Sequence, residues 1–309
     1  MHTASMILDF QHVTKKFGKM TVVNDVSFQI REGEIYGLLG PNGAGKTTVI
    51  KTIVGHLRPT SGQILISSYD VHKEFQDAID FVGAIVEYPM HYDYMTGYQN
   101  LKLTAHMYPE VTPERVEEVI DLVGLKSRIH DPVRKYSLGM RQRLSLAQSI
   151  LNYPQLLILD EPMNGLDPLG MRDLRNMLKS LAANGMSVLI SSHILGEMDQ
   201  LCDRIGILSH GYLIAERDME EFHHTQQPFY EVRVNDAEAA LEILKTEFGD
   251  QLLAEEVVAG TLKVQSAVIS SAQINRTLVK GGVEVQEIYE KKQSLEELYL
   301  QLTGGAEIE

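Results

Sequence analysis

The sequence predicts an α/β protein built on a mixed sheet, followed by a smaller α+β domain. Short apolar runs at residues 35–39, 156–159 and 188–190 each lie beside a helical pattern, which is typical of parallel strands covered by helices. Residues 6–30 alternate in polarity, as antiparallel strands do. From about Pro228 the order changes to strand, helix, strand, strand, helix, strand.

This change of rhythm divides the chain into two predicted domains. Residues 6–220 form the first, in which we expect residues 88–135 to be mostly helical and a helical subdomain to cover about 88–150. Residues 228–303 form an accessory domain whose element order is consistent with a ferredoxin-like fold. The first two strands are expected to meet at a turn at residues 15–19.

Composition restricts the function further. Of 309 residues, 44% are hydrophobic and 23% are charged, as in an ordinary globular protein. No apolar run approaches the length of about eighteen residues that crosses a bilayer, and the first residues are unlike a secretory signal. We therefore expect a cytosolic protein unless a partner holds it at a membrane. The net charge of -14 argues against nucleic acid as a partner, because such binding relies on Lys and Arg.

A glycine-rich loop follows the run at residues 35–39 and precedes a helical pattern. It fits G-x-x-x-x-G-K-[ST], a nucleotide-binding motif, in the strand–loop–helix setting that the motif requires. Glycines let backbone N–H groups converge on phosphate oxygens, and the helix N-terminus adds positive partial charge. Lys46 is expected to reach the β- and γ-phosphates of ATP, and the Thr47 hydroxyl to bind Mg²⁺. The predicted nucleotide-binding residues are Gly40, Pro41, Asn42, Gly43, Ala44, Gly45, Lys46, Thr47 and Thr48.

Two carboxylates end the apolar run at residues 156–159. Ligands in such sheets bind at the carboxyl ends of the strands, so Asp160 and Glu161 should face the phosphates. Asp160 is suited to holding Mg²⁺, directly or through water, and Glu161 to polarising the attacking water as a general base. A surface turn before Pro162 is the plainer alternative, which the upstream phosphate loop argues against.

The segment YSLGMRQR at residues 136–143 contains a second candidate anion site. Ser137 is a natural N-cap, so its hydroxyl and the amide of Gly139 lie at the positive end of a helix. Such a site can bind the γ-phosphate of a nucleotide that a second molecule holds. A helix cap without a ligand is the alternative for Ser137 taken alone.

This segment resembles the signature motif of ABC ATPases, usually LSGGQ, and further motifs extend the resemblance over residues 6–215. The segment NGLD, ending at Asp167, looks like the D-loop of that family. His193 matches its switch histidine, which implies a catalytic contact to the γ-phosphate or the attacking water. Phe17 matches the aromatic residue that stacks on adenine.

The resemblance also implies partners. Two such domains pack head to tail, with each ATP trapped between the phosphate loop of one protomer and the signature of the other. The second protomer is another copy of this chain or a sister ATPase. The pair drives a separate membrane-spanning permease, which places the chain at the inner face of the cell membrane.

The chain departs from the family pattern at three positions, two in the signature segment and one at the Q-loop. Leu138 replaces the first glycine of the signature and Met140 replaces its glutamine, but Ser137 and Gly139 are retained, so we expect activity to survive. Glu87 stands at the position of the Q-loop glutamine, where the resemblance implies contacts to the metal and water. Its carboxylate offers an oxygen to Mg²⁺ but donates no hydrogen bond when ionised.

Together with Glu87 and the C-terminal SLEELYLQLTG, the signature segment resembles one branch of the family. This branch comprises the ATPases of bacterial peptide-antibiotic resistance and lantibiotic-immunity exporters, including the bacitracin type. The resemblance implies export of a peptide antibiotic or another amphipathic compound. The alternatives are a soluble ABC ATPase with no role in transport, and a regulatory partner of another ATPase subunit.

Tyrosine and methionine residues crowd the segment after Glu87. They are expected either to pack against the helical subdomain or to form a partly exposed groove for a helix of the permease, because Tyr and Met are enriched at interface cores. These residues are Tyr88, Met90, Tyr92, Tyr94, Met95 and Tyr98.

Overall fold

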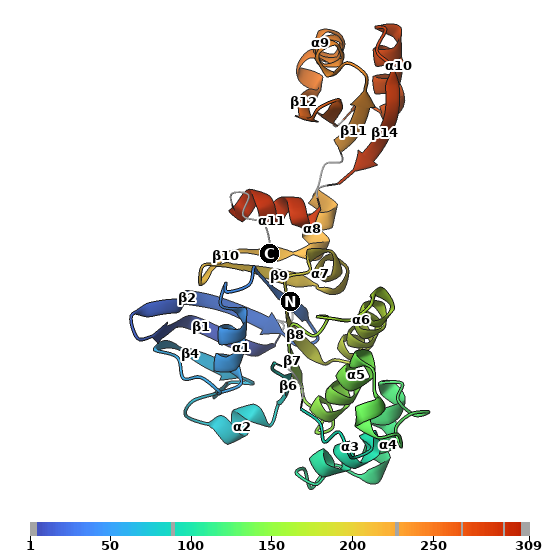
Figure 1. The fold of residues 1–309 in the computed structure, drawn as a ribbon. Helices are drawn as coiled ribbons and strands as arrows, with labels where there is room; N and C mark the ends of the chain where they lie inside the picture. Colours follow the sequence, from blue (N-terminus) through green and yellow to red (C-terminus); the bar gives the residue numbers. More distant parts are fainter. Residues whose placement is uncertain (1–4, 88–89, 226–228, 267, 293, 304–309) are drawn as a thin grey trace. The chain divides into compact units, whose positions relative to one another are not determined.

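The structure, a computed structural model, describes residues 5–87, 90–225, 229–266, 268–292 and 294–303. The chain divides into two compact units, whose elements are labelled in Figure 1. The first unit extends to Met219 and also includes the residues from Tyr299, and the second is Glu220–Leu298. Among the described residues, no helix combines the length and the apolar character that crossing a bilayer requires.

An antiparallel sheet begins the first unit, in the order β2-β1-β4-β5. Its strands are β1 (Met6–Phe17), β2 (Met20–Arg31), β4 (Ser61–Ile66) and β5 (Tyr69–Asp70). The predicted antiparallel pair is confirmed, but its turn is shorter than expected. Lys15 still pairs with Val23 and Phe17 with Met20, and the chain reverses after Phe17 through Gly18, which has a φ of 59°.

A second sheet of six strands has the order β10-β9-β3-β8-β7-β6. The strands are β3 (Ile35–Leu39), β6 (Val82–Ile85), β7 (Leu156–Asp160), β8 (Ser187–Ser192), β9 (Arg204–Ser209) and β10 (Tyr212–Asp218). All neighbours are parallel except β10, which is antiparallel to β9. β3, β7 and β8 are buried along their whole length, and this is why the sequence contains short apolar runs within them.

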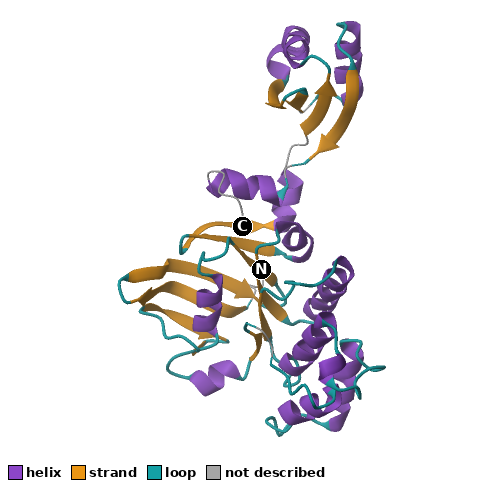
Figure 2. Ribbon diagram, in the orientation of Figure 1, coloured by secondary structure: helices purple, strands orange, loops and turns teal. Residues whose placement is uncertain are grey.

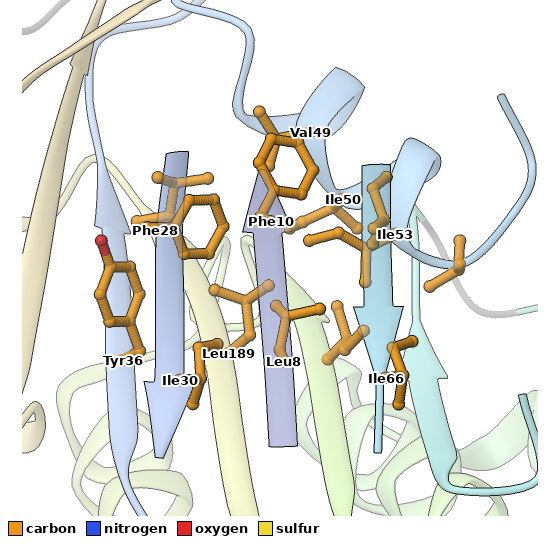
Figure 3. Packing of buried hydrophobic residues seen from close by; sticks show 14 of the residues in the cluster. Leu8, Phe10, Phe28, Ile30, Tyr36, Val49, Ile50, Ile53, Ile66 and Leu189 are labelled. Atoms are coloured by element: carbon orange, nitrogen blue, oxygen red, sulfur yellow. The ribbon is translucent and has the colours of Figure 1, made fainter. Parts of the chain in front are cut away.

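The core of the first unit lies between its sheets and α1 (Lys46–Ile53), as Figure 3 shows. Phe10, Phe28 and Tyr36 stack in series, with ring centroids 4.9 Å apart in the first pair and 5.1 Å apart in the second. Three apolar residues of α1 are fully buried in the same cluster: Val49, Ile50 and Ile53. Because α1 begins at the end of the phosphate loop, this packing also holds the loop in place.

Helices cover the remaining parts of the first unit (Figure 2). They are α2 (Phe75–Ile79), α3 (Gly97–Ala105), α4 (Pro113–Leu122), the 3₁₀ helix Val133–Lys135, α5 (Leu138–Ser149), α6 (Pro168–Ala183) and α7 (Leu195–Leu201). The expectation of a mostly helical segment at residues 88–135 is wrong for residues 90–96. Thr96 caps α3 through Gln99 and so starts the helix only at Gly97.

Arg115 of α4 supports the far end of α5. Its guanidinium donates to Ile150 O at 2.6 Å and to Leu151 O at 3.3 Å. These carbonyls lie at the C-terminus of α5, where helix carbonyls have no partner within the helix. The side chain is 7% exposed, so α4 and α5 are joined by a buried polar contact as well as by apolar packing.

The second unit contains a four-stranded antiparallel sheet in the order β12-β13-β11-β14. Its elements are β11 (Phe229–Val234), α9 (Ala237–Phe248), the 3₁₀ helix Gly249–Gln251, β12 (Leu253–Val258), β13 (Thr261–Gln265), α10 (Ser271–Lys280) and β14 (Val285–Lys291). The predicted order of strands and helices is confirmed. The ferredoxin-like assignment stays a prediction, which this strand order supports. Two helices lie at the limits of the unit, α8 (Met219–Thr225) and α11 (Leu295–Thr303).

We expect Phe28→Ala to lower the free energy of unfolding of the first unit by about 3–5 kcal/mol, because it removes the central ring of the buried stack. Met20→Ala, in the same strand but at a side chain that is 69% exposed, should change it by about 0.5 kcal/mol or less. Urea denaturation of both variants measures the difference. Equal losses would contradict the assignment of the core.

Candidate active site

The phosphate loop takes a shape that depends on its glycines. A Cβ on Gly40 would lie 2.3 Å from Leu208 O, and a Cβ on Gly45 would lie 2.9 Å from Val22 O. Gly45 also has a φ of 109°, a conformation that side chains with a Cβ rarely adopt. The loop is therefore pressed against β9 and β2 immediately before it enters α1.

Lys46 is buried at the end of this loop, with 5% of its surface exposed. Its Nζ donates to Gly40 O at 2.6 Å and to Pro41 O at 3.2 Å, and it lies 3.1 Å from Oε1 of Glu161. A buried charge is tolerated when such polar groups surround it. The ammonium thus links the loop to the acidic end of β7.

Asp160 and Glu161 are positioned by a serine on the neighbouring strand. Asp160 lies opposite Ser191 in the parallel pairing of β7 with β8. Ser191 Oγ donates to Asp160 Oδ1 at 2.7 Å and accepts from the backbone N–H of Glu161 at 2.9 Å. Glu161 leaves the strand with a φ of 49°, and its Oε2 lies 2.9 Å from Nδ1 of His193. The Ser191 hydroxyl therefore positions the Asp160 side chain and the Glu161 backbone.

The Glu161 carboxylate has a nitrogen group at each oxygen, Lys46 at Oε1 and His193 at Oε2. A carboxylate oriented in this way, next to a phosphate-binding loop, can accept a proton from water that attacks a phosphate. Asp160 is 8% exposed and held by Ser191, and Thr47 follows Lys46 at the start of α1. Their oxygens are the kind of donor that Mg²⁺ prefers.

Glu87 lies at the edge of the site. Its carboxylate forms an ion pair with Lys51 on α1, and its backbone has a φ of 63°. The hydrogen bond from Lys51 lowers the pKa of Glu87, and the positive charge of Lys51 acts in the same direction. The carboxylate is therefore ionised at neutral pH, and its charge is balanced by a residue of the helix that follows the phosphate loop.

Phe17 lies at the end of β1 with 47% of its surface exposed. Nζ of Lys15 lies 4.9 Å from the centroid of its ring. Lys15 also donates to Arg58 O at 2.7 Å, which fixes the ammonium beside the ring. An exposed aromatic ring of this kind can stack on a nucleotide base.

The signature segment forms a separate hollow of about 450 Å³. Ser137 caps α5, since its Oγ accepts from the N–H of Met140 at 3.3 Å. Leu138 packs against Gly165, where an added Cβ would lie 2.8 Å from the leucine side chain. Gly139 and Asp167 line the same hollow, so the signature and the D-loop lie together. None of the phosphate-loop residues lines it.

The tyrosine and methionine residues after Glu87 divide between exposed and half-buried positions. Met90, Tyr92 and Tyr94 are 93%, 55% and 71% exposed. Met95 and Tyr98 are half-buried, and Tyr88 lies outside the described residues. Met90 also lines a groove of about 420 Å³ between β6 and helices α3 and α5. The segment therefore has an exposed part and a half-buried part, and a role of the exposed part in binding a permease stays a prediction.

Two residues of the site were missed by sequence reasoning. Ser191 was the first, although SSH directly follows the apolar run at residues 188–190, at the end of a strand that the same reasoning predicted. Lys51 was the second, and its only signal is a position five residues after Lys46 on a predicted helix. Neither signal indicates which residue the side chain contacts.

The glycine loop, the buried lysine and the acidic strand end on a parallel sheet define a P-loop nucleotide-binding protein. A family model described as ABC transporter matches residues 23–164. The chain is 42% identical over 306 residues to the uncharacterized ABC transporter ATP-binding protein YhcH of Bacillus subtilis, with 96% of each chain covered. It is 36% identical over 303 residues to the bacitracin transport ATP-binding protein BcrA of Enterococcus faecalis, with 98% of each covered.

A third relative matches a shorter region. The lantibiotic transport ATP-binding protein SrtF of Streptococcus pyogenes is 38% identical over 223 residues, which cover 72% of this chain and 96% of SrtF. Among solved structures, the ATP binding subunit of an ABC transporter has a TM-score of 0.64 at 30% identity, covering 71% of this chain and 92% of that chain. The chain belongs to the ABC transporter ATP-binding proteins, and it hydrolyses ATP to power transport. The resemblance to ABC ATPases is confirmed, and so is the predicted α/β fold of an ABC ATPase followed by a small second domain.

We expect Ser191→Ala to lower kcat for ATP hydrolysis by about tenfold or more, because Asp160 and the Glu161 backbone lose their shared partner. Ser187→Ala is a matched control at the other end of β8, where Oγ accepts only from Gly33 N–H at 3.0 Å. Steady-state ATPase assays of the two variants make the comparison. Equal activities would show that Ser191 does not position the acids.

Proposed function

We propose that two copies of this chain bind two ATP molecules between them and drive a membrane-spanning permease that exports a peptide antibiotic or another amphipathic compound. The observation that carries the catalytic part is the Glu161 carboxylate, held between Lys46 and His193 at the end of β7. A regulatory role without catalysis fits this less well, because each position that the reaction needs is occupied.

Each residue of the nucleotide site has a defined role in this proposal. Residues 40–48 bind the phosphates, with Lys46 at the β- and γ-phosphates, and Phe17 stacks on adenine. Glu161 accepts the proton of the attacking water, and His193 orients that carboxylate and contacts the γ-phosphate. The contact of 2.9 Å between His193 and Glu161 supports this division of roles, because an oriented base needs no rearrangement before it reacts.

Thr47 and Asp160 hold Mg²⁺ in this proposal, and Glu87 contributes a further oxygen. The ion would neutralise charge on the phosphates during hydrolysis. Support comes from the burial of Asp160 and from the hydrogen bond that fixes its orientation. Lys51 balances the additional negative charge that Glu87 brings to the position.

The second copy completes each site in this proposal. The signature hollow with Ser137, Gly139 and Asp167 is separate from the phosphate loop, which supports an ATP molecule that contacts the two elements in different chains. A helix N-terminus without acidic residues in its first turn suits a γ-phosphate. The second copy is another molecule of this chain or a sister ATPase.

The permease docks on the exposed Met90, Tyr92 and Tyr94 and on the groove that Met90 lines. Large apolar side chains that are exposed next to a groove are typical of protein interaction sites. This docking holds the chain at the inner face of the cell membrane. The names of BcrA and SrtF, which cite bacitracin and lantibiotic transport, support the antibiotic as the exported compound.

We expect Glu161→Gln to abolish turnover while ATP still binds, so that a dimer with trapped ATP accumulates. Size-exclusion chromatography with and without ATP measures the dimer, and a phosphate-release assay measures the turnover. The double variant Lys46→Ala/Glu161→Gln is the control and should stay monomeric, because it loses the phosphate contact of Lys46. Hydrolysis by Glu161→Gln at the parent rate would show that Glu161 is not the base.

We expect Tyr92→Ala and Tyr94→Ala to leave ATP hydrolysis by the isolated chain unchanged and to weaken assembly with the permease. Both side chains are exposed, and their rings contact each other with centroids 5.9 Å apart, so each substitution removes contact area for a partner and only this one ring contact on the surface. Co-purification of the permease with the tagged chain measures assembly. Tyr289→Ala, at an exposed tyrosine of the second unit, is the control. Normal assembly with loss of ATPase activity would contradict the assignment of this surface.

A further inference from the structure

Residues 90–95 form a two-sided segment, here called the strap. Met90, Tyr92 and Tyr94 are exposed, whereas the polar side chains between them, His91 and Asp93, contact α5. The strap is anchored at its centre by α3. Asn100 accepts a hydrogen bond from the backbone N–H of Tyr92 at 2.9 Å and donates one to its carbonyl at 3.2 Å.

His91 joins the strap to the middle of α5. Its Nε2 lies 2.9 Å from Ser145 Oγ and 3.2 Å from Arg141 O. Ser145 Oγ itself donates to Arg141 O at 2.9 Å. Because the carbonyl only accepts and the hydroxyl hydrogen is already used, Nε2 carries the hydrogen, which lies between Ser145 Oγ and Arg141 O as acceptors. Ser145 is 4% exposed, so this contact is shielded from water.

Asp93 joins the strap to the first turn of α5. Its Oδ1 accepts from Nη1 of Arg141 at 2.6 Å, and its carbonyl accepts from the N–H of Arg134 at 3.0 Å. The N–H of Arg141 donates to Ser137 O at 3.0 Å. Arg141 therefore takes part in both strap contacts and lies one hydrogen bond away from the signature serine.

We propose that His91 and Asp93 are positioning residues, which hold the first turn of α5 so that Ser137 and Gly139 meet the γ-phosphate of a nucleotide on the second copy. The inference rests on the proposed function for the role of the signature. The inference identifies the residues that hold the first turn of α5 in place. It also links these residues to the surface on which the permease docks.

His91 carries more of this effect than Asp93. The Asp93 carboxylate is 59% exposed and Arg141 is 30% exposed, and an ion pair in such surroundings contributes little. The hydrogen bond of His91 to Ser145 is shielded, and its removal leaves a buried hydroxyl with one partner fewer. Displacement of the strap by a docked partner therefore acts on the signature turn mainly through His91.

The first test measures ATP-dependent dimerisation in the Glu161→Gln background. His91→Ala should raise the ATP concentration for half-maximal dimer by about tenfold, which corresponds to ~1.4 kcal/mol for each bound ATP. His91→Gln places an N–H donor in the same region and should restore the parent value. Asp93→Ala should produce a smaller shift, which the charge swap Asp93→Arg/Arg141→Asp reverses. The affinity of the monomer for a fluorescent ATP analogue, measured at protein concentrations too low for dimer, should be unchanged in all variants.

Two outcomes of this test would overturn the proposal. One is dimerisation of His91→Ala at the parent ATP concentration. The other is an equal loss in His91→Ala and His91→Gln together with weaker binding of the analogue by the monomer, because that result indicates a general loss of structure.

A second measurement separates this inference from the proposed function. Hydrogen exchange of the backbone amides at residues 138–142 in the monomer should be faster in His91→Ala than in the parent and slow again in His91→Gln, with the amides of α1 unchanged. If the Glu161→Gln parent forms no dimer with ATP, the proposed function fails and the exchange rates still decide the role of His91. Unchanged exchange at residues 138–142 in His91→Ala would overturn the role of His91 as a positioning residue.

Discussion

The active site depends on the pairing of β8 with β3 on one side and with β7 on the other. Ser192 lies opposite Leu39, and Ser191 lies opposite Asp160. The residues that follow these strand ends, among them Glu161 and His193, therefore leave the sheet at one edge. A slip of one residue in either pairing would turn the side chains of that strand to the other face of the sheet, and the hydroxyl of Ser191 would no longer meet the acids.

Burial makes the ionic contacts at this edge sensitive to change. Lys46 is close to fully buried and contacts the Glu161 carboxylate, which also contacts His193. Removing one member of such a group leaves an uncompensated charge, and this costs more than the intact pair contributes to stability. Stability alone therefore does not explain the arrangement, whereas the proposed role of Glu161 in catalysis does. Removing one member of the more exposed pair of Lys51 and Glu87 should cost much less, because solvent screens the charge that is left.

The signature is attached to the protein in a different way from the phosphate loop. The loop is enclosed between strands, and its glycines meet backbone atoms of β2 and β9. The signature lies at the start of α5, whose far end is held by Arg115 and whose first turns are held by the strap. A helix held at side-chain contacts can shift more readily than a loop enclosed by backbone. This difference allows the strap to act on one half of the proposed composite site while the other half stays fixed.

The sequence by itself determined the elements that depend on local patterns. The strand at residues 35–39, the phosphate loop, the acidic end of β7 and the element order of the second unit all follow from periodicity, glycine spacing and turn chemistry. The sequence did not show that residues 90–96 form a non-helical segment with a turn, in which Met95 N–H donates to Tyr92 O, because this conformation depends on contacts with α3 and α5. Only the tertiary structure paired Ser191 with Asp160 and Lys51 with Glu87, which are 31 and 36 residues apart. Such partners are chosen by strand register and helix packing, and neither is encoded in a short segment of the chain.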